Sequence, residues 1–105
     1  GLFVRSGYRG GVPKGYEVQI NATHTDPIKT GSLYPNGEFG LAKYRDVFTV
    51  LNTAPHKADE WFTEEVIAAG PTLTVLVNGK ETVKWTDPDH RFKAGHFALQ
   101  GHDPG

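Results

Sequence analysis

Hydrophobic and polar residues alternate in several short stretches of the chain, which predicts β-strands. In Gly15–Ile20 an apolar face alternates with a polar face that carries Glu17 and Gln19. Similar stretches recur along the chain, so we expect about seven strands. They are Leu2–Ser6, Gly15–Ile20, Ser32–Tyr34, Trp61–Ala69, Thr72–Val77, Lys80–Thr86 and Gly95–Gly101.

Turn signals separate these stretches. Asn78-Gly79 lies between two β-branched runs and predicts a hairpin, because both residue types tolerate a positive φ. We interpret 61–69 as a strand, although its Glu and Ala content also suits a helix. The Gly70-Pro71 break after it and the β-rich segment beyond favour the strand. Residues 38–59 predict a long irregular loop with a helical turn near Leu41–Asp46.

The predicted elements are nearly all strands, which indicates an all-β fold. The chain has 105 residues, which suits a single domain over 1–105. Its 13 Gly and 7 Pro fit many turns between short strands. We therefore expect an antiparallel β-sandwich of the jelly-roll type. The absence of Cys excludes disulfides and thiolate chemistry.

Charge and motifs exclude several classes of function. The net charge is −1 and no basic stripe occurs, so we expect no nucleic-acid partner. No apolar run approaches the roughly 20 residues of a membrane helix, so we expect no membrane insertion. The chain has no GxSxG motif, phosphate-binding loop or dinucleotide fingerprint.

The polar faces of the predicted strands carry a set of hydrogen-bonding side chains that would meet if the strands are neighbours in one sheet. These residue types bind sugar hydroxyls and include an acid–base pair. The alternative is that they are ordinary solvent-facing positions of a half-exposed sheet. Tyr34 adds an aromatic ring that can stack on a sugar. The candidates are therefore Arg5, Glu17, Gln19, Tyr34, His96, Gln100 and His102.

An acidic cluster raises the alternative of a metal site. It comprises Asp87, Asp89 and His90, with Asp103 further along the chain. Turns are rich in Asp and Pro for backbone reasons, and no HExxH or EF-hand pattern is present. We therefore predict no metal and no other cofactor. Calcium is the alternative that the oxygen ligands favour.

Six segments resemble the 3-keto-disaccharide hydrolase domain family. In chain order they are "GLFVRS", "GYEVQI", "TGSLY", "EWFTEEVIAAG", "VLVNGKETVKWTD" and "GHFALQGHDPG". The resemblance spans essentially the whole chain. It implies a concanavalin A-like jelly-roll sandwich and a bacterial, secreted or periplasmic protein. It also implies activity on glycosides whose C3 hydroxyl is oxidised to a ketone.

Family-like positions suggest roles in that chemistry. Arg5, Glu17, Gln100 and His102 lie within the matching segments. We expect Glu17 or His102 to be the base that removes the C2 proton, and His102 can also act as an acid. Arg5 would stabilise the enolate, and Gln19 and Gln100 would orient hydroxyls. His96 and Tyr34 complete the expected substrate contacts.

Two other functions stay open. Family domains carry further strands before and after the matching core, so we expect a core fragment without its terminal strands. Its open sheet edges would permit self-association, and a purely structural fragment is one alternative. A non-catalytic carbohydrate-binding module is the other. Direct hydrolysis needs two facing carboxylates. Only Glu17 clearly lies in the predicted cleft, with Asp103 as a second candidate, which favours keto-glycoside chemistry.

Overall fold

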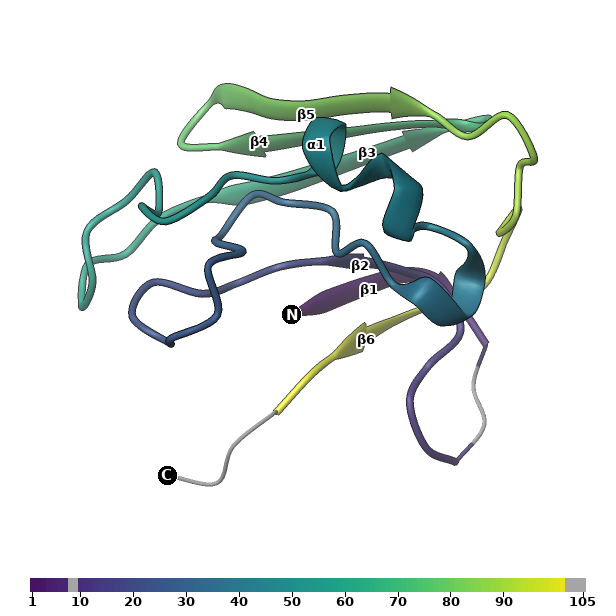
Figure 1. Cartoon of the computed structure of the whole chain (residues 1–105), viewed down its shortest axis with the longest axis horizontal. Coiled ribbons are helices and arrows are strands. Elements are labelled where there is room, and N and C mark those ends of the chain that lie inside the picture. Colours follow the sequence, from purple (N-terminus) through teal and green to yellow (C-terminus); the bar gives the residue numbers. More distant parts are fainter. Residues whose placement is uncertain (8–9, 102–105) are drawn as a thin grey trace.

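Two antiparallel β-sheets face one another in the computed structural model, which describes residues 1–7 and 10–101 (Figure 1). The strands are β1 (Leu2–Ser6), β2 (Tyr16–Val18), β3 (Glu64–Ala69), β4 (Thr72–Val77), β5 (Lys80–Thr86) and β6 (His96–Leu99). Their order is β2–β1–β6 in the first sheet and β3–β4–β5 in the second. This arrangement confirms the predicted all-β sandwich.

The core lies between the sheets and is built from alternate residues of the strands. In β4, Leu73, Val75 and Val77 are buried, whereas the residues between them are half-buried. Val4 of β1 and Val18 of β2 belong to the same apolar cluster as Leu73 and Val75. Burial of an aliphatic side chain of this size contributes about 1.5–3 kcal/mol. These facing residues therefore hold the two sheets together.

The hairpin between β4 and β5 turns at the predicted dipeptide. Asn78 has a φ of 50° and Gly79 a φ of 80°. Two consecutive positive φ angles match the tight turn whose twist fits that of the flanking strands. Across the other end of the hairpin, the hydroxyls of Thr72 and Thr86 are hydrogen-bonded at 2.8 Å. The predicted hairpin is confirmed.

The ambiguous stretch 61–69 forms a strand from Glu64 onward. β3 pairs with β4 along its whole length, from Glu64 opposite Val77 to Ala69 opposite Thr72. The edge of the β4–β5 hairpin supplies backbone partners, and this pairing outweighs the helical propensity of Glu and Ala. The strand interpretation is confirmed, with a later start than expected.

The connection between β2 and β3 carries short helical turns instead of a further strand. The expected strand Ser32–Tyr34 is wrong, because Leu33 makes only a single bridge, to Val18. Pro35 follows at once and has no N–H to extend a ladder. The expected helical turn near Leu41–Asp46 is confirmed. The helical elements are η1 (Gly37–Phe39), η2 (Ala42–Tyr44) and α1 (Arg45–Phe48).

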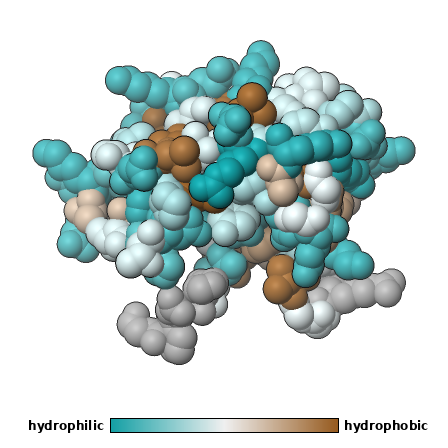
Figure 2. All heavy atoms as spheres, viewed as in Figure 1, coloured by the Kyte–Doolittle hydropathy of each residue, from teal (hydrophilic) through white to brown (hydrophobic). Residues whose placement is uncertain are grey.

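Hydrophilic residues cover most of the face shown in Figure 2, and apolar residues appear there in small separate patches. The core is therefore largely shielded from solvent on this side. Within 1–7 and 10–101, no helix has the length and apolar character needed to cross a membrane.

Candidate functional site

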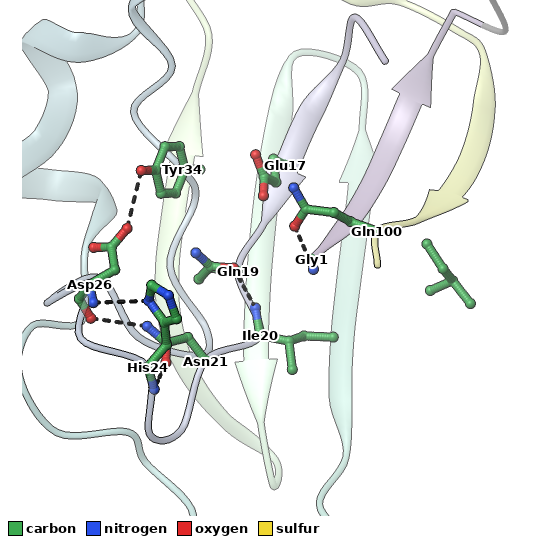
Figure 3. A pocket seen from close by; sticks show the side chains of 10 residues that line it. Gly1, Glu17, Gln19, Ile20, Asn21, His24, Asp26, Tyr34 and Gln100 are labelled. Atoms are coloured by element: carbon green, nitrogen blue, oxygen red, sulfur yellow. Dashed lines mark hydrogen bonds between the residues drawn. The ribbon is translucent and has the colours of Figure 1, made fainter. Parts of the chain in front are cut away.

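A cleft of about 600 Å³ lies where β1 begins and where β2 and β6 end (Figure 3). The antiparallel register creates this meeting point, because Leu2 of β1 lies opposite Val18 and also opposite Leu99. Residues that follow β2 and β6 are thereby brought together from distant parts of the sequence. The polar residues that line the cleft are Glu17, Gln19, Asn21, His24, Asp26, Tyr34 and Gln100.

Glu17 is the carboxylate nearest the sheet. It lies opposite Phe3 in the β1–β2 ladder, whereas Val4 and Tyr16 occupy the alternate positions that face the core. Glu17 is only 9% exposed. Its backbone carbonyl accepts a hydrogen bond from the Tyr34 N–H at 2.8 Å, which anchors the loop beside it. The predicted base therefore lies at the floor of a cleft, on the face turned away from the core.

The two glutamines expected to contact substrate also line the cleft. Gln19 Oε1 accepts a hydrogen bond from the Ile20 N–H at 3.0 Å. Gln100 Oε1 accepts one from the Gly1 nitrogen at 3.0 Å. Figure 3 shows Gln19 and Gln100 on either side of the lower part of Glu17. One amide group is thus held by a backbone N–H and the other by the amino group of Gly1 at the cleft surface.

Tyr34 and Asp26 form a hydrogen-bonded pair on another wall. The Tyr34 hydroxyl donates to Asp26 Oδ2 at 3.2 Å, and the Ile28 N–H donates to Asp26 Oδ1 at 2.9 Å. Burial, together with the charge of Asp26, raises the pKa of Tyr34 above its ordinary value of 10.0. Tyr34 is therefore a neutral phenol at neutral pH. The expectation that Glu17 alone clearly occupies the cleft is wrong, because Asp26 is a second carboxylate there.

His24 and Asp26 are cleft residues that the sequence patterns did not identify. Both lie in a polar loop, where alternation gives no facing information. The side chain of Asn21, which is buried, organises this loop by donating to the carbonyls of Asp26 at 3.0 Å and Ile28 at 2.8 Å. The only signal for these residues was their closeness in sequence to the strand that carries Glu17.

Arg5 is placed elsewhere, and its expected role at the enolate is not supported. The β1–β6 register shifts between Phe3 and Ser6, and Arg5 has a φ of 53°. This bulge breaks the alternation that would put Arg5 on the face of Glu17. The guanidinium instead donates to the carbonyls of Gly70, of Ala68 at 3.1 Å and of Phe92 at 3.3 Å.

Glycine permits this bulge. A Cβ on Gly95 would lie 2.5 Å from the carbonyl carbon of Arg5 and 2.6 Å from the Ser6 carbonyl oxygen. Only a residue without a side chain lets the start of β6 approach the bulged backbone so closely. The position of Arg5 is thus determined by two segments that are 90 residues apart in sequence.

The two remaining predicted residues are histidines. His96 begins β6 opposite Ser6, whose hydroxyl donates to the His96 carbonyl at 2.9 Å. It is exposed at the far end of β6 from Gln100 and does not line the cleft. His102 lies outside the described residues, as does Asp103, so their predicted roles remain predictions.

In the acidic cluster after β5, Asp87 has a structural role, because its carboxylate is held by several hydrogen bonds and an ion pair. Asp87 is 2% exposed and accepts hydrogen bonds from the Tyr16 hydroxyl at 2.6 Å and from the N–H groups of Asp89 and Arg91. The Arg91 guanidinium also pairs with it. Burial alone would raise the pKa of Asp87, but these bonds hold it below its ordinary 3.8. In the described part of the chain, no three His, Asp or Glu side chains are grouped to hold a metal ion.

Comparison with known proteins gives one match. A family model described as the 3-keto-alpha-glucoside-1,2-lyase-like domain matches residues 1–105, the whole chain. No curated protein and no solved structure matches the chain.

Proposed function

The chain belongs to the 3-keto-alpha-glucoside-1,2-lyase-like domain family, and we propose that its cleft binds a glycoside oxidised to a ketone at C3 and eliminates the group on C1. The observation that carries this proposal is the position of Glu17. It is a nearly buried carboxylate at the floor of a cleft lined by amide, phenol and imidazole groups. Such groups suit sugar oxygens, and the carboxylate suits proton abstraction.

The proposed reaction has two steps. Glu17 takes the C2 proton, which the neighbouring C3 carbonyl acidifies, and the electron pair of the C2–H bond forms an enolate. The enolate then restores the carbonyl and forms a C1=C2 double bond, while the C1–O bond breaks and the leaving oxygen takes up a proton. The products are an unsaturated keto sugar and an alcohol. Addition of water across C1=C2 completes a net hydrolysis.

The size and lining of the cleft fit this substrate class. A volume of about 600 Å³ lies in the usual range for small-molecule sites, about 300–1,000 Å³. Gln19 and Gln100 are the groups that we expect to orient hydroxyls. The half-buried ring of Tyr34 supplies an apolar surface for a sugar ring.

Asp26 supports a second candidate, direct hydrolysis of an unoxidised glycoside by two carboxylates. Its contacts favour the first. One Asp26 oxygen accepts from the Tyr34 hydroxyl and the other from the Ile28 N–H. Both oxygens therefore already have donors, which leaves Asp26 poorly suited to carry the proton that a general acid must deliver.

The test compares purified wild-type chain with Glu17→Gln on methyl 3-keto-α-glucoside, with products followed by NMR. We expect Glu17→Gln to lose about 10²- to 10⁴-fold in rate, the usual value of a general base. Glu65→Gln is the matched control, because Glu65 is exposed on β3 and outside the cleft. Binding of the sugar without turnover by the wild type would overturn the proposal in favour of a binding module. Turnover that is lost in Asp26→Asn but kept in Glu17→Gln would overturn it in favour of direct hydrolysis.

A further inference from the structure

The loop of residues 21–30 forms one wall of the cleft, and Thr30 at its end contacts a histidine that lies outside the cleft lining. The loop supplies His24 and Asp26 to the lining, whereas His56 does not belong to it. We infer that His56 is a positioning residue, which holds this loop through the Thr30 hydroxyl and so strengthens substrate binding. The effect on binding rests on the proposed function, whereas the contact with Thr30 does not.

The contacts of the His56 ring identify which of its nitrogens carries the proton. Nδ1 lies 3.1 Å from the Lys57 carbonyl oxygen. A carbonyl oxygen can only accept, so Nδ1 carries the proton, and Nε2 of the neutral ring presents a lone pair. Nε2 lies 2.8 Å from Thr30 Oγ1. The Thr30 hydroxyl therefore donates to His56, and the ring is the acceptor for this hydroxyl proton.

Thr30 passes the contact on to the start of the loop. Its Oγ1 accepts from the Asn21 N–H at 2.9 Å, and its own N–H donates to the Asn21 carbonyl at 3.2 Å. The two ends of the loop are thus bonded to each other. Thr30 is 0% exposed, so a hydroxyl proton without an acceptor would be costly there. His56 supplies that acceptor and leaves the Thr30 oxygen to accept from Asn21.

The His56 ring is itself held on the side of the second sheet. It stacks on Phe62, with ring centroids 3.8 Å apart and ring planes 12° from parallel. The next residue, Thr63, is bonded to Asn78 at the turn between β4 and β5. The Thr63 N–H donates to Asn78 Oδ1 at 3.0 Å, and the Thr63 carbonyl accepts from the Asn78 N–H at 2.8 Å. The loop that lines the cleft is therefore connected through His56 to the β4–β5 hairpin.

The backbone just after the loop has contacts of its own that do not depend on His56. The Gly31 N–H donates to the Gln19 carbonyl at 3.1 Å and to Glu64 Oε1 at 3.2 Å. The Gly31 carbonyl accepts from the Thr82 hydroxyl at 2.6 Å. Loss of the His56 ring should therefore loosen the loop and leave Gly31 in place.

The expected consequence is a change in KM more than in kcat. Glu17, the proposed base, lies on β2 and is placed by its pairing with Phe3 of β1. The loop, by contrast, carries His24 and Asp26 at the wall of the cleft. Loosening the loop should thus weaken sugar binding and leave proton abstraction by Glu17 largely unchanged.

The first experiment reads the tautomer of His56 without activity. Long-range ¹H–¹⁵N correlation spectra of the ¹⁵N-labelled full chain, recorded at alkaline pH, identify which ring nitrogen of each histidine carries the proton. The spectrum of His56→Gln assigns the His56 signals by their loss. We expect the Nδ1–H form for His56. Observation of the Nε2–H form would overturn the inference, because Nε2 could then not accept from Thr30.

The second experiment is a double-mutant cycle on KM for methyl 3-keto-α-glucoside. We expect His56→Ala and Thr30→Val each to raise KM about 2- to 10-fold at nearly unchanged kcat, as for loss of one hydrogen bond. Both changes remove the same bond, so the double variant should have the KM of the more affected single variant. His56→Gln keeps an acceptor for Thr30 and should recover part of the loss. Lys57→Ala is the matched control, because Lys57 is exposed and contacts His56 through its backbone carbonyl.

Amide hydrogen exchange gives a third readout that needs no turnover. The Asn21 N–H, which is bonded to Thr30, should exchange about 2- to 10-fold faster in His56→Ala than in the wild type. The Gly31 N–H, whose acceptors lie elsewhere, should keep its rate and is the internal control.

The outcomes distinguish this inference from the proposed function. A wild-type KM in His56→Ala, or additive effects of the two substitutions on KM, would overturn the role of His56 while the proposed function stands. Absence of turnover by the folded wild type would overturn the proposed function. In that case faster exchange of the Asn21 N–H in His56→Ala would still support the hold of His56 on the loop, and unchanged exchange would overturn it.

Discussion

At the scale of single residues, Arg5 shows how one backbone angle moves a side chain away from an expected site. Strict alternation along β1 would place Arg5 on the face of Phe3 and Glu17. The bulge between Phe3 and Ser6, with its positive φ at Arg5, directs the guanidinium to carbonyls of β3 and the turn after it. A bulge of this kind leaves almost no mark on the pattern of apolar and polar residues, so it could not be predicted from the sequence.

We predict that Arg5→Ala acts on stability and leaves the chemistry intact. The variant loses the charged donor to three carbonyls. The free energy of unfolding in urea should fall by about 1.5–3 kcal/mol, the usual value for hydrogen bonds to a charged group. Arg5→Lys should recover only part, because an ammonium cannot span the same carbonyls. A loss of kcat in a variant of unchanged stability would contradict this role.

Glu64 is a half-buried acid at the start of β3 whose environment disfavours its charge. Oε1 accepts from the Gly31 N–H at 3.2 Å, and Oε2 is buried without a hydrogen-bond partner among the described residues. Burial raises the pKa of Glu64 to about 7, which the bond from Gly31 only partly offsets. Because the folded-state pKa exceeds the ordinary 4.5, the folded chain holds this proton more tightly than the unfolded chain.

We therefore predict that Glu64 weakens the fold as the pH rises. Its stabilising contribution is complete below pH 4.5 and is lost as the pH rises to about 7. Glu64→Gln stays neutral, so its free energy of unfolding relative to the wild type should increase between pH 5 and pH 8 in urea titrations. Glu65→Gln, on the exposed side of the same strand, is the control. Parallel pH profiles for wild type and Glu64→Gln would refute this account.

At the scale of elements, the regular strands were predictable, whereas the loop that lines the cleft was not. The alternation in β4 and the Asn78-Gly79 turn identified the β4–β5 hairpin, because local patterns determine both. The loop from Asn21 to Thr30 has no such period. Its shape depends on hydrogen bonds of the buried Asn21 side chain, which help to hold His24 and Asp26 at the cleft.

We predict that Asn21→Ala loosens this loop. The change removes two donated bonds and one accepted bond in a buried position, which should cost about 2–4 kcal/mol in the free energy of unfolding. The KM for a keto-glycoside should rise, because His24 and Asp26 lose their support. Asn21→Asp keeps the acceptor for the His24 N–H and is the matched comparison. An unchanged KM with faster backbone exchange in the loop would show that the loop does not shape the cleft.

At the scale of the whole molecule, the cleft is a product of strand pairing. β1 lies between β2 and β6, so Glu17, Gln19 and Gln100 meet although more than 80 residues separate the first from the last. Their polar positions could be predicted from alternation, but their convergence depends on which strands are neighbours. From the sequence this convergence could be stated only as a condition, and the β2–β1–β6 order meets that condition for these three residues.

The most direct test of the central claim is the ratio of kcat/KM for methyl 3-keto-α-glucoside to that for methyl α-glucoside, measured with the wild-type chain. The proposed elimination, in which Glu17 is the base, requires the C3 ketone, because only the ketone acidifies the C2 proton. The account predicts turnover of the keto compound, reduced about 10²- to 10⁴-fold in Glu17→Gln, and no measurable turnover of the parent glycoside. Comparable turnover of both compounds would contradict it.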